Sequence, residues 1–305
     1  MAMEEHYEDS DLARRQGRLV GRHTRPKVIL PATLFLATVV TTMTVGAFYE
    51  GANPLKNPLS LLKGIPFSAP LLFILGTHEL GHFFASRRHG VASTLPFFIP
   101  APPVPPFIGT FGAVIKMKSP ITTRRALVDI GAAGPLAGFI AALIVLAWGI
   151  RLSTVIPRPS FGEEFGLGTP LVFDLLSYLI AGPVPDGYEL SLHTVAFAGW
   201  IGLFVTSLNL LPIGQLDGGH IVYALFGAAH RWISLAVVAA LVIFGIYSWP
   251  GWLVWAALST IIGIRHPPVV DSNIPLGALR VVVSVLAMAV FILTFMPAPF
   301  YIRGL

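Results

Sequence analysis

The segment FILGTHELGHFFASRR, residues 73–88, places three ionisable side chains inside an apolar run. His78 and His82 are four residues apart and Glu79 follows the first, which matches the pattern HExxH. On a helix, positions i and i+4 share a face, so the two imidazoles can bind one zinc ion while Glu79 faces its water. The alternative is a trio of polar residues that hydrogen-bond inside a helical bundle. Ionisable residues in a membrane segment usually serve a function, which favours the metal site.

A catalytic zinc site usually has three protein ligands, and this chain has no cysteine to supply one. The metzincin spacing would need glycine and histidine where Ala85 and Arg88 stand, and no acidic residue occurs between Glu79 and Asp129. Asp129 follows two arginines at the start of a predicted span, where helix capping or a salt bridge explains it. We therefore favour Asp217 as the third ligand.

Asp217 lies in NLLPIGQLDGGH, residues 209–220. Pro212 and Gly214 interrupt a predicted helix there, and Gly218 and Gly219 allow other backbone to approach closely. A carboxylate at such a break can point sideways toward a neighbouring helix. The alternative is an aspartate that caps the next helix, at about 221–226.

The elements that must position these residues are membrane helices. Hydrophobic residues make up 54% of the chain, charged residues 11%, and the mean hydropathy is +0.75. These values are typical of a polytopic membrane protein and argue against a soluble domain. The basic residues near the N-terminus abut a span, so we interpret them as a topology signal and a lipid contact, and we expect no nucleic-acid partner.

About seven spans of sufficient length can be counted. The run 232–264 is broken at SWPGW (248–252), which predicts two short helices joined by a turn. Lys and Arg concentrate on the side of the N-terminus, which predicts that this side is cytoplasmic. The other predicted spans are roughly 28–49, 69–86, 126–150, 192–211 and 281–297.

We expect residues 1–26 to form a disordered cytoplasmic tail and residues 27–305 to form one membrane domain, with a catalytic core at about 69–226. Within the loop 151–191, residues 170–182 predict an interfacial helix. Residues 95–120 are apolar but rich in proline, so a regular helix is excluded. In this segment 107–115 is either a short strand with an open edge or a membrane-surface loop.

Three motifs in order carry a family resemblance: HELGH, then GAAGPLAG at 131–138, then NLLPIGQLDGG. Together they resemble the site-2 protease family of intramembrane zinc metalloproteases, over roughly residues 70–220. The resemblance implies an all-α polytopic fold with a three-helix catalytic core and a small membrane-associated β-element beside the site. Many members carry a PDZ domain or a C-terminal soluble domain, and neither the loop 151–191 nor the residues after 297 have room for one.

Carried onto this chain, the resemblance implies Zn²⁺ bound by His78, His82 and Asp217, with Glu79 as the catalytic glutamate. It also implies that Asn209 lies near the backbone of a bound substrate. A capping or helix–helix hydrogen bond is the alternative for Asn209.

The function that follows is hydrolysis of peptide bonds in or near the transmembrane segments of single-span membrane proteins. An unwound substrate could pair with the strand edge at 107–115, where Gly109 and Gly112 are candidate substrate-binding positions. The alternatives are a catalytically inactive membrane scaffold or substrate-binding relative, and a metal transporter. We expect a prokaryotic cytoplasmic membrane. A chloroplast-type organelle is the alternative, and the acidic residues at 4–11 argue against the intact transit peptide that it would need. We assign no metal to His220, for which we expect a surface role, with a secondary polar contact as the alternative. The sequence predicts no oligomeric state.

Overall fold

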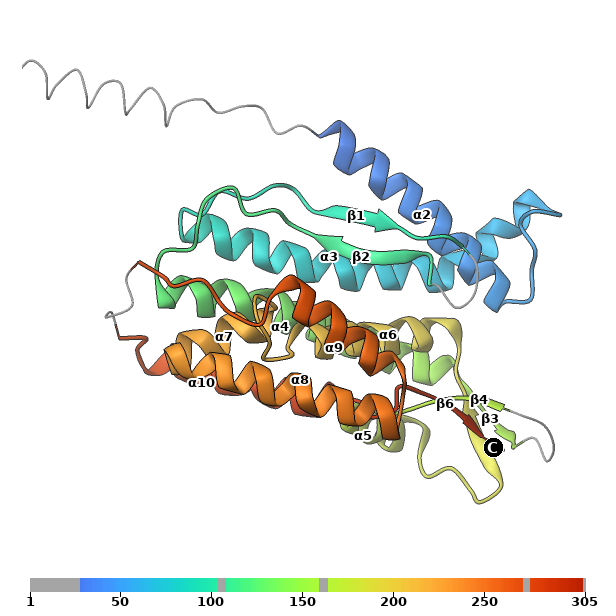
Figure 1. Ribbon diagram of the computed structural model, residues 1–305. Helices are drawn as coiled ribbons and strands as arrows, with labels where there is room; N and C mark the ends of the chain where they lie inside the picture. The colour runs from blue at the N-terminus through green and yellow to red at the C-terminus, as the bar shows by residue number, and fades with distance from the viewer. Residues whose placement is uncertain (1–27, 104–107, 159–163, 271–274, 304–305) are drawn as a thin grey trace, which may run out of the picture.

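The computed structural model describes residues 28–103, 108–158, 164–270 and 275–303. The tail predicted at 1–26 lies outside these ranges. The described part of the chain is mostly helical and carries small two-stranded sheets (Figure 1). Its helices are α2 (Ile29–Tyr49), α3 (Ile65–Arg88), α4 (Arg124–Leu152), α5 (Leu171–Ala181), α6 (Thr194–Asn209), α7 (Asp217–Phe226), α8 (His230–Tyr247), α9 (Gly251–Ile262) and α10 (Ala278–Thr294), with 3-10 turns at Pro58–Gly64 and Gly227–Ala229.

Four helical segments are long and apolar enough to cross a membrane, among the residues described. They are Ile29–Tyr49, Pro58–Arg88, Arg124–Leu152 and Asp217–Tyr247. Helices α5, α6, α9 and α10 are apolar but shorter. The count of about seven spans therefore stays a prediction, whereas the membrane character of the chain rests on these four segments.

Two predicted interruptions are confirmed. Helix α8 ends at Tyr247 and α9 begins at Gly251, so the run 232–264 is two helices joined at the predicted turn. Helix α6 ends at Asn209 and α7 begins at Asp217, which is the predicted break around Pro212. The helix expected at 170–182 is α5, which covers Leu171–Ala181.

The core lies where α3, α4 and α6 pack together. Leu71, Leu146 and Trp200, one from each helix, are fully buried. Small residues bring the backbones close: a side chain at Gly199 of α6 would press against the backbone of Leu146 in α4 at 2.8 Å. Within lipid there is no hydrophobic driving force for helix association, so close packing at small residues stabilises such a bundle.

The predicted strand exists. Strand β2 (Thr110–Val114) pairs antiparallel with β1 (Phe97–Pro100), in the register Phe97 with Val114 and Phe98 with Ala113. Figure 1 shows this hairpin lying along α3. Two further antiparallel pairs are not indicated by the sequence: β3 (Thr154–Pro157) with β5 (Tyr188–Ser191), and β4 (Glu164–Leu167) with β6 (Phe300–Arg303).

Candidate metal centre

Helices α3 and α7 bring the three predicted metal ligands together, although α7 begins 135 residues after His82. The His78 and His82 Nε2 atoms are 3.1 Å apart. The Asp217 Oδ2 atom lies 3.2 Å from His82 Nε2 and 3.4 Å from His78 Nε2. The two histidines are 5% and 6% exposed, so the group is almost shielded from solvent.

These separations fit one zinc ion. Zinc bonds of about 2.0–2.1 Å in a tetrahedron place neighbouring ligand atoms about 3.3 Å apart. The three measured distances, 3.1 to 3.4 Å, bracket that value. Two imidazoles and one carboxylate are also a donor set that zinc accepts, and three protein ligands leave the fourth position open. In the part of the chain that the structure describes, no other group of His, Asp and Glu meets the geometry of a metal site.

A backbone carbonyl orients the ring of His82. His82 Nδ1 lies 2.8 Å from the carbonyl oxygen of Ile130 in α4. A carbonyl only accepts hydrogen bonds, so Nδ1 carries the proton and Nε2 presents its lone pair to a metal. The Asp217 carboxylate does not cap α7, since no side-chain cap is formed at that helix start. Of the two alternatives for Asp217, the structure therefore favours the sideways carboxylate.

Helix α4 supplies a floor of glycines beneath the ligands. A side chain at Gly134 would overlap the His82 ring, and one at Gly138 would stand 3.0 Å from His78 Nδ1. One at Gly131 would stand 3.1 Å from the backbone oxygen of Asp217. These positions are spaced three and four residues apart and so share one helix face. The motif GAAGPLAG thus does more than pack helices: it makes room for all three ligands.

Glu79 is 7% exposed and is not one of the three clustered ligands. Its carboxylate accepts a hydrogen bond from the backbone N–H of Ile115, directly after β2. The β1–β2 hairpin and Glu79 therefore meet at the site, where the family resemblance implies a β-element.

The remaining candidates lie at different distances from the metal group. The Asn209 amide nitrogen is 3.4 Å from His78 Nε2, so Asn209 borders the site from the end of α6. Gly112 has a positive φ of 99° and open space around it on β2. Gly109 lies against α2 instead, where its carbonyl accepts a hydrogen bond of 2.6 Å from the Thr41 hydroxyl.

Asp129 belongs to a different cluster. Its carboxylate pairs with Arg280 of α10 at 2.7 Å and with His89 at 2.8 Å. The salt bridge predicted for Asp129 is therefore present, although its partners are not the two adjacent arginines. The start of α4 is capped by Thr123, whose hydroxyl accepts from the N–H of Ala126.

For His220 the structure favours the alternative, a secondary polar contact, over the expected surface role. Its Nδ1 atom lies 2.7 Å from His266 Nε2, and the residue is partly buried. The chain after α9 returns over α7 and covers this histidine. His266 lies just after the predicted run 232–264, and its place in the sequence does not indicate that it meets His220.

The chain resembles known proteins over much of its length. The family model for peptidase family M50 matches residues 66–248. "Probable zinc metalloprotease EGY2, chloroplastic" of Arabidopsis thaliana is 33% identical over 176 residues, which cover 55% of this chain and 30% of the relative. "Probable zinc metalloprotease EGY1, chloroplastic" of the same plant is 31% identical over 243 residues, covering 71% and 43%.

The relative from rice, "Probable zinc metalloprotease EGY2, chloroplastic" of Oryza sativa subsp. japonica, is 33% identical over 223 residues and 70% of this chain. The chain spans 30 to 43% of the length of these relatives. No solved structure matches it significantly. The family match covers all three ligands, the glutamate and the α4 glycines, and the relatives carry zinc in their names. The chain belongs to peptidase family M50, the site-2 protease family of zinc metallopeptidases.

Proposed function

We propose that this protein cuts peptide bonds in or near the transmembrane segments of single-span membrane proteins. The observation that carries the proposal is the metal group with Glu79 beside it, inside a candidate membrane span. His82 precedes Arg87 by five residues, so at 1.5 Å per residue the site lies about 8 Å from the basic end of α3. Water can reach that depth from the helix end, whereas a soluble substrate would have little reason to enter.

The residues divide the chemistry. His78, His82 and Asp217 would hold zinc, which when bound supplies Lewis acidity: it lowers the pKa of a water toward about 7 and polarises a carbonyl. Glu79 takes the proton of the attacking water and returns it to the leaving amine. The Ile115 N–H holds the Glu79 carboxylate in place, and burial keeps bulk water from competing for the proton.

A free strand edge supports the substrate side of the proposal. Backbone N–H and C=O groups of consecutive strand residues point to opposite edges, so those of every second residue share an edge, and the N–H of Ile115 points to Glu79. The N–H and C=O of Ala113 therefore lie on the same edge, away from β1. An unwound substrate can pair there by β-augmentation, with its scissile bond carried toward the metal group. Asn209 borders the same space and can hydrogen-bond substrate backbone.

The decisive experiment compares purified wild type and Glu79→Gln on a panel of single-span membrane substrates, with zinc content measured on the same samples. We expect cleavage by wild type only, with equal zinc in both, and we expect a chelator to abolish cleavage and added zinc to restore it. Zinc-loaded wild type that cuts no substrate in the panel would favour a binding protein or scaffold. Zinc transport into vesicles without cleavage would favour a transporter.

The edge is tested by Ala113→Pro, which removes one free N–H without breaking a bond to β1. We expect cleavage to fall about fivefold with zinc content unchanged, because a hydrogen bond contributes about 1 kcal/mol. Ala113→Val keeps the N–H and is the control. Equal activity of the proline variant would remove β-augmentation from the proposal while leaving the metal chemistry in place.

The orientation also stays a proposal. The excess of Lys and Arg on one side supports a cytoplasmic N-terminus, as we expect for a prokaryotic cytoplasmic membrane. Reporter fusions at the two ends of α3 would test it.

A further inference from the structure

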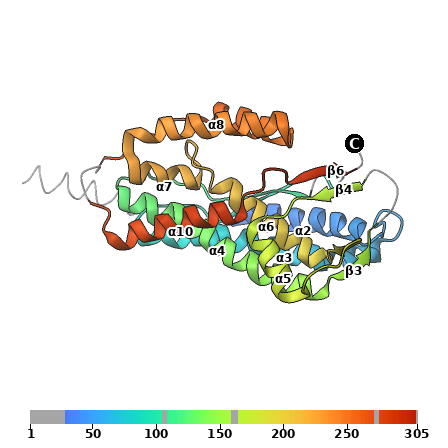
Figure 2. The ribbon, with the colours of Figure 1, turned by 90° about the horizontal axis from the view of Figure 1, so that it is seen from below.

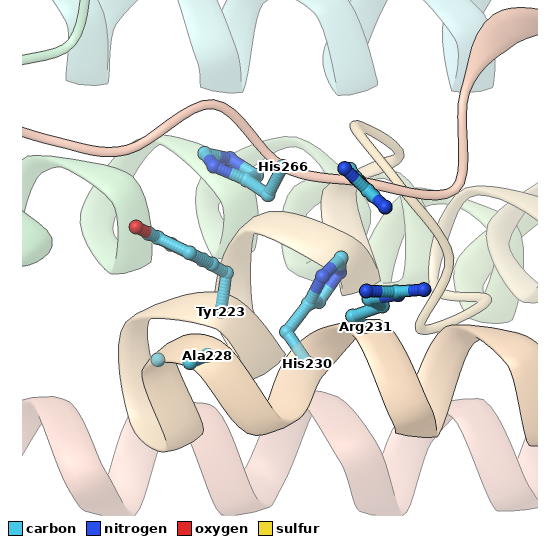
Figure 3. A pocket seen from close by; sticks show the side chains of 7 residues that line it. Tyr223, Ala228, His230, Arg231 and His266 are labelled. Carbon is cyan, nitrogen blue, oxygen red and sulfur yellow. The ribbon is translucent and has the colours of Figure 1, made fainter.

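A cavity of about 210 Å³ lies where the end of α7, the start of α8 and the chain after α9 meet. Tyr223, His230, Arg231 and His266 surround it (Figure 3), and Arg265 completes the polar wall. A single water needs only about 15 Å³ of such space. The cavity therefore has room for a polar ligand group, and it shares no residue with the metal centre.

The charged side chains of this wall are both cations. Arg231 and Arg265 are exposed, and neither forms an ion pair with any residue that the structure describes. No carboxylate lines the cavity. Burial lowers the pKa of the His266 imidazole, so this ring is neutral at pH 7 and the charge comes from the arginines. Two unpaired guanidinium groups around one cavity favour an anion.

The remainder of the wall is held in place. His266 donates its Nδ1 proton to the carbonyl of Pro267 at 2.6 Å, so its Nε2 accepts from His220 Nδ1 at 2.7 Å. The same ring stacks on Tyr223 with centroids 4.2 Å apart. His230 is 1% exposed and its Nε2 lies 3.3 Å from the Ser234 hydroxyl. Its Nδ1 has no hydrogen-bond partner among the described residues and is available to a ligand.

The surroundings place the cavity at the height of lipid headgroups. Trp232, next to Arg231, is 67% exposed, and the Arg231 guanidinium lies 5.3 Å from its ring centre. Tryptophan at a helix end is typical of the membrane–water interface. Figure 2 shows α8 on the outside of the bundle, where lipid can reach its first turn. A guanidinium group can form two parallel hydrogen bonds to the oxygens of a phosphate or a carboxylate, so these are the anions that fit it best.

We propose that this cavity binds a phosphate group, carried by an anionic lipid headgroup or by a small soluble phosphate. Arg231 and Arg265 would contact the phosphate oxygens, beside the buried His230 ring. The proposal does not rest on the proposed protease activity, since none of the described residues that line the cavity belongs to the metal group.

The test uses the full chain with inorganic phosphate as one probe and phosphatidylglycerol in phosphatidylcholine nanodiscs as the other. Wild type is compared with Arg231→Gln/Arg265→Gln. We expect the double variant to bind at least about tenfold more weakly, because charge-assisted hydrogen bonds are among the strong ones. Binding is read as retained phosphatidylglycerol by native mass spectrometry, and as a saturable rise of the unfolding midpoint with phosphate at constant ionic strength.

Arg87→Gln/Arg88→Gln is the matched control, since it removes two exposed cations from α3 outside the cavity. It should bind as wild type does, and equal zinc content in all samples would show that each variant folds. Weaker binding by Arg231→Gln/Arg265→Gln than by wild type with phosphatidylglycerol alone identifies a lipid headgroup as the ligand. Weaker binding with free phosphate alone identifies a soluble ligand. Equal binding by wild type and Arg231→Gln/Arg265→Gln with both probes would overturn the proposal.

Discussion

Two aspartates near the start of neighbouring helices contact histidines in α3 or directly after its end, yet their surroundings differ. Asp217 of α7 meets His78 and His82 at 3.4 and 3.2 Å. Asp129 of α4 meets His89 at 2.8 Å and Arg280 at 2.7 Å. Both carboxylates are partly buried, with 19% and 28% of the side chain exposed.

The two carboxylates differ in whether a permanently charged side chain lies beside them. Arg280 satisfies both oxygens of Asp129 with three hydrogen bonds, so its charge is already neutralised. Asp217 has no arginine or lysine partner among the described residues, and its neighbours are imidazoles whose Nε2 atoms converge on it. A buried carboxylate without a cation is costly, and a metal ion supplies the missing charge. Charge balance thus separates a metal ligand from a structural ion pair.

The largest effect should come from exchanging the two aspartates for alanine in turn. Asp217→Ala should lose zinc and slow cleavage by about a thousandfold or more, because the Lewis acid contributes several kcal/mol to the transition state. Asp129→Ala should keep zinc. Metal analysis and cleavage rates on the same preparations provide the measurement, and full zinc retention in Asp217→Ala would show that the third ligand lies elsewhere.

A smaller effect should follow from filling the glycine floor. Gly134→Ala forces a methyl group into the His82 ring, so we expect clear loss of zinc and a cost of about 1–3 kcal/mol from overpacking. Gly138→Ala, at 3.0 Å from His78, should lose less.

The matched control for these two is Gly76→Ala in α3, whose added carbon would make an ordinary contact of 3.6 Å with the Phe98 ring. Zinc affinity measured by competition with a chelator should rank Gly76→Ala above Gly138→Ala and Gly134→Ala last. Any other order of zinc affinities would show that contact between these glycines and the ligands does not control metal binding.

The smallest effect concerns the ion pair. Asp129→Asn and Arg280→Gln should each lower the free energy of unfolding by about 1–2 kcal/mol, since both side chains are partly exposed. A double-mutant cycle should give a coupling energy of about 1 kcal/mol, with zinc content unaffected. Additive losses in the cycle would mean that Arg280 does not stabilise Asp129.

Much of the site could be predicted because its signals are local. The spacing of His78 and His82 defines a shared helix face, and the break around Pro212 marks where a carboxylate can turn. The strand near Gly112 was one of two options, and backbone pairing with β1 decided between them. The contact between Gly134 and the His82 ring could not be predicted, because small residues are common in membrane helices and their sequence does not say which side chain they face.

The sequence by itself determined the membrane character, the metal-binding pair and the family, since hydropathy and short motifs depend only on neighbours along the chain. The tertiary structure decided which acid joins the metal group, which arginine neutralises the other, and that His220 meets His266. Those partners are separated by 135, 151 and 46 residues. Contacts over such separations depend on how the helices pack, which no local pattern encodes.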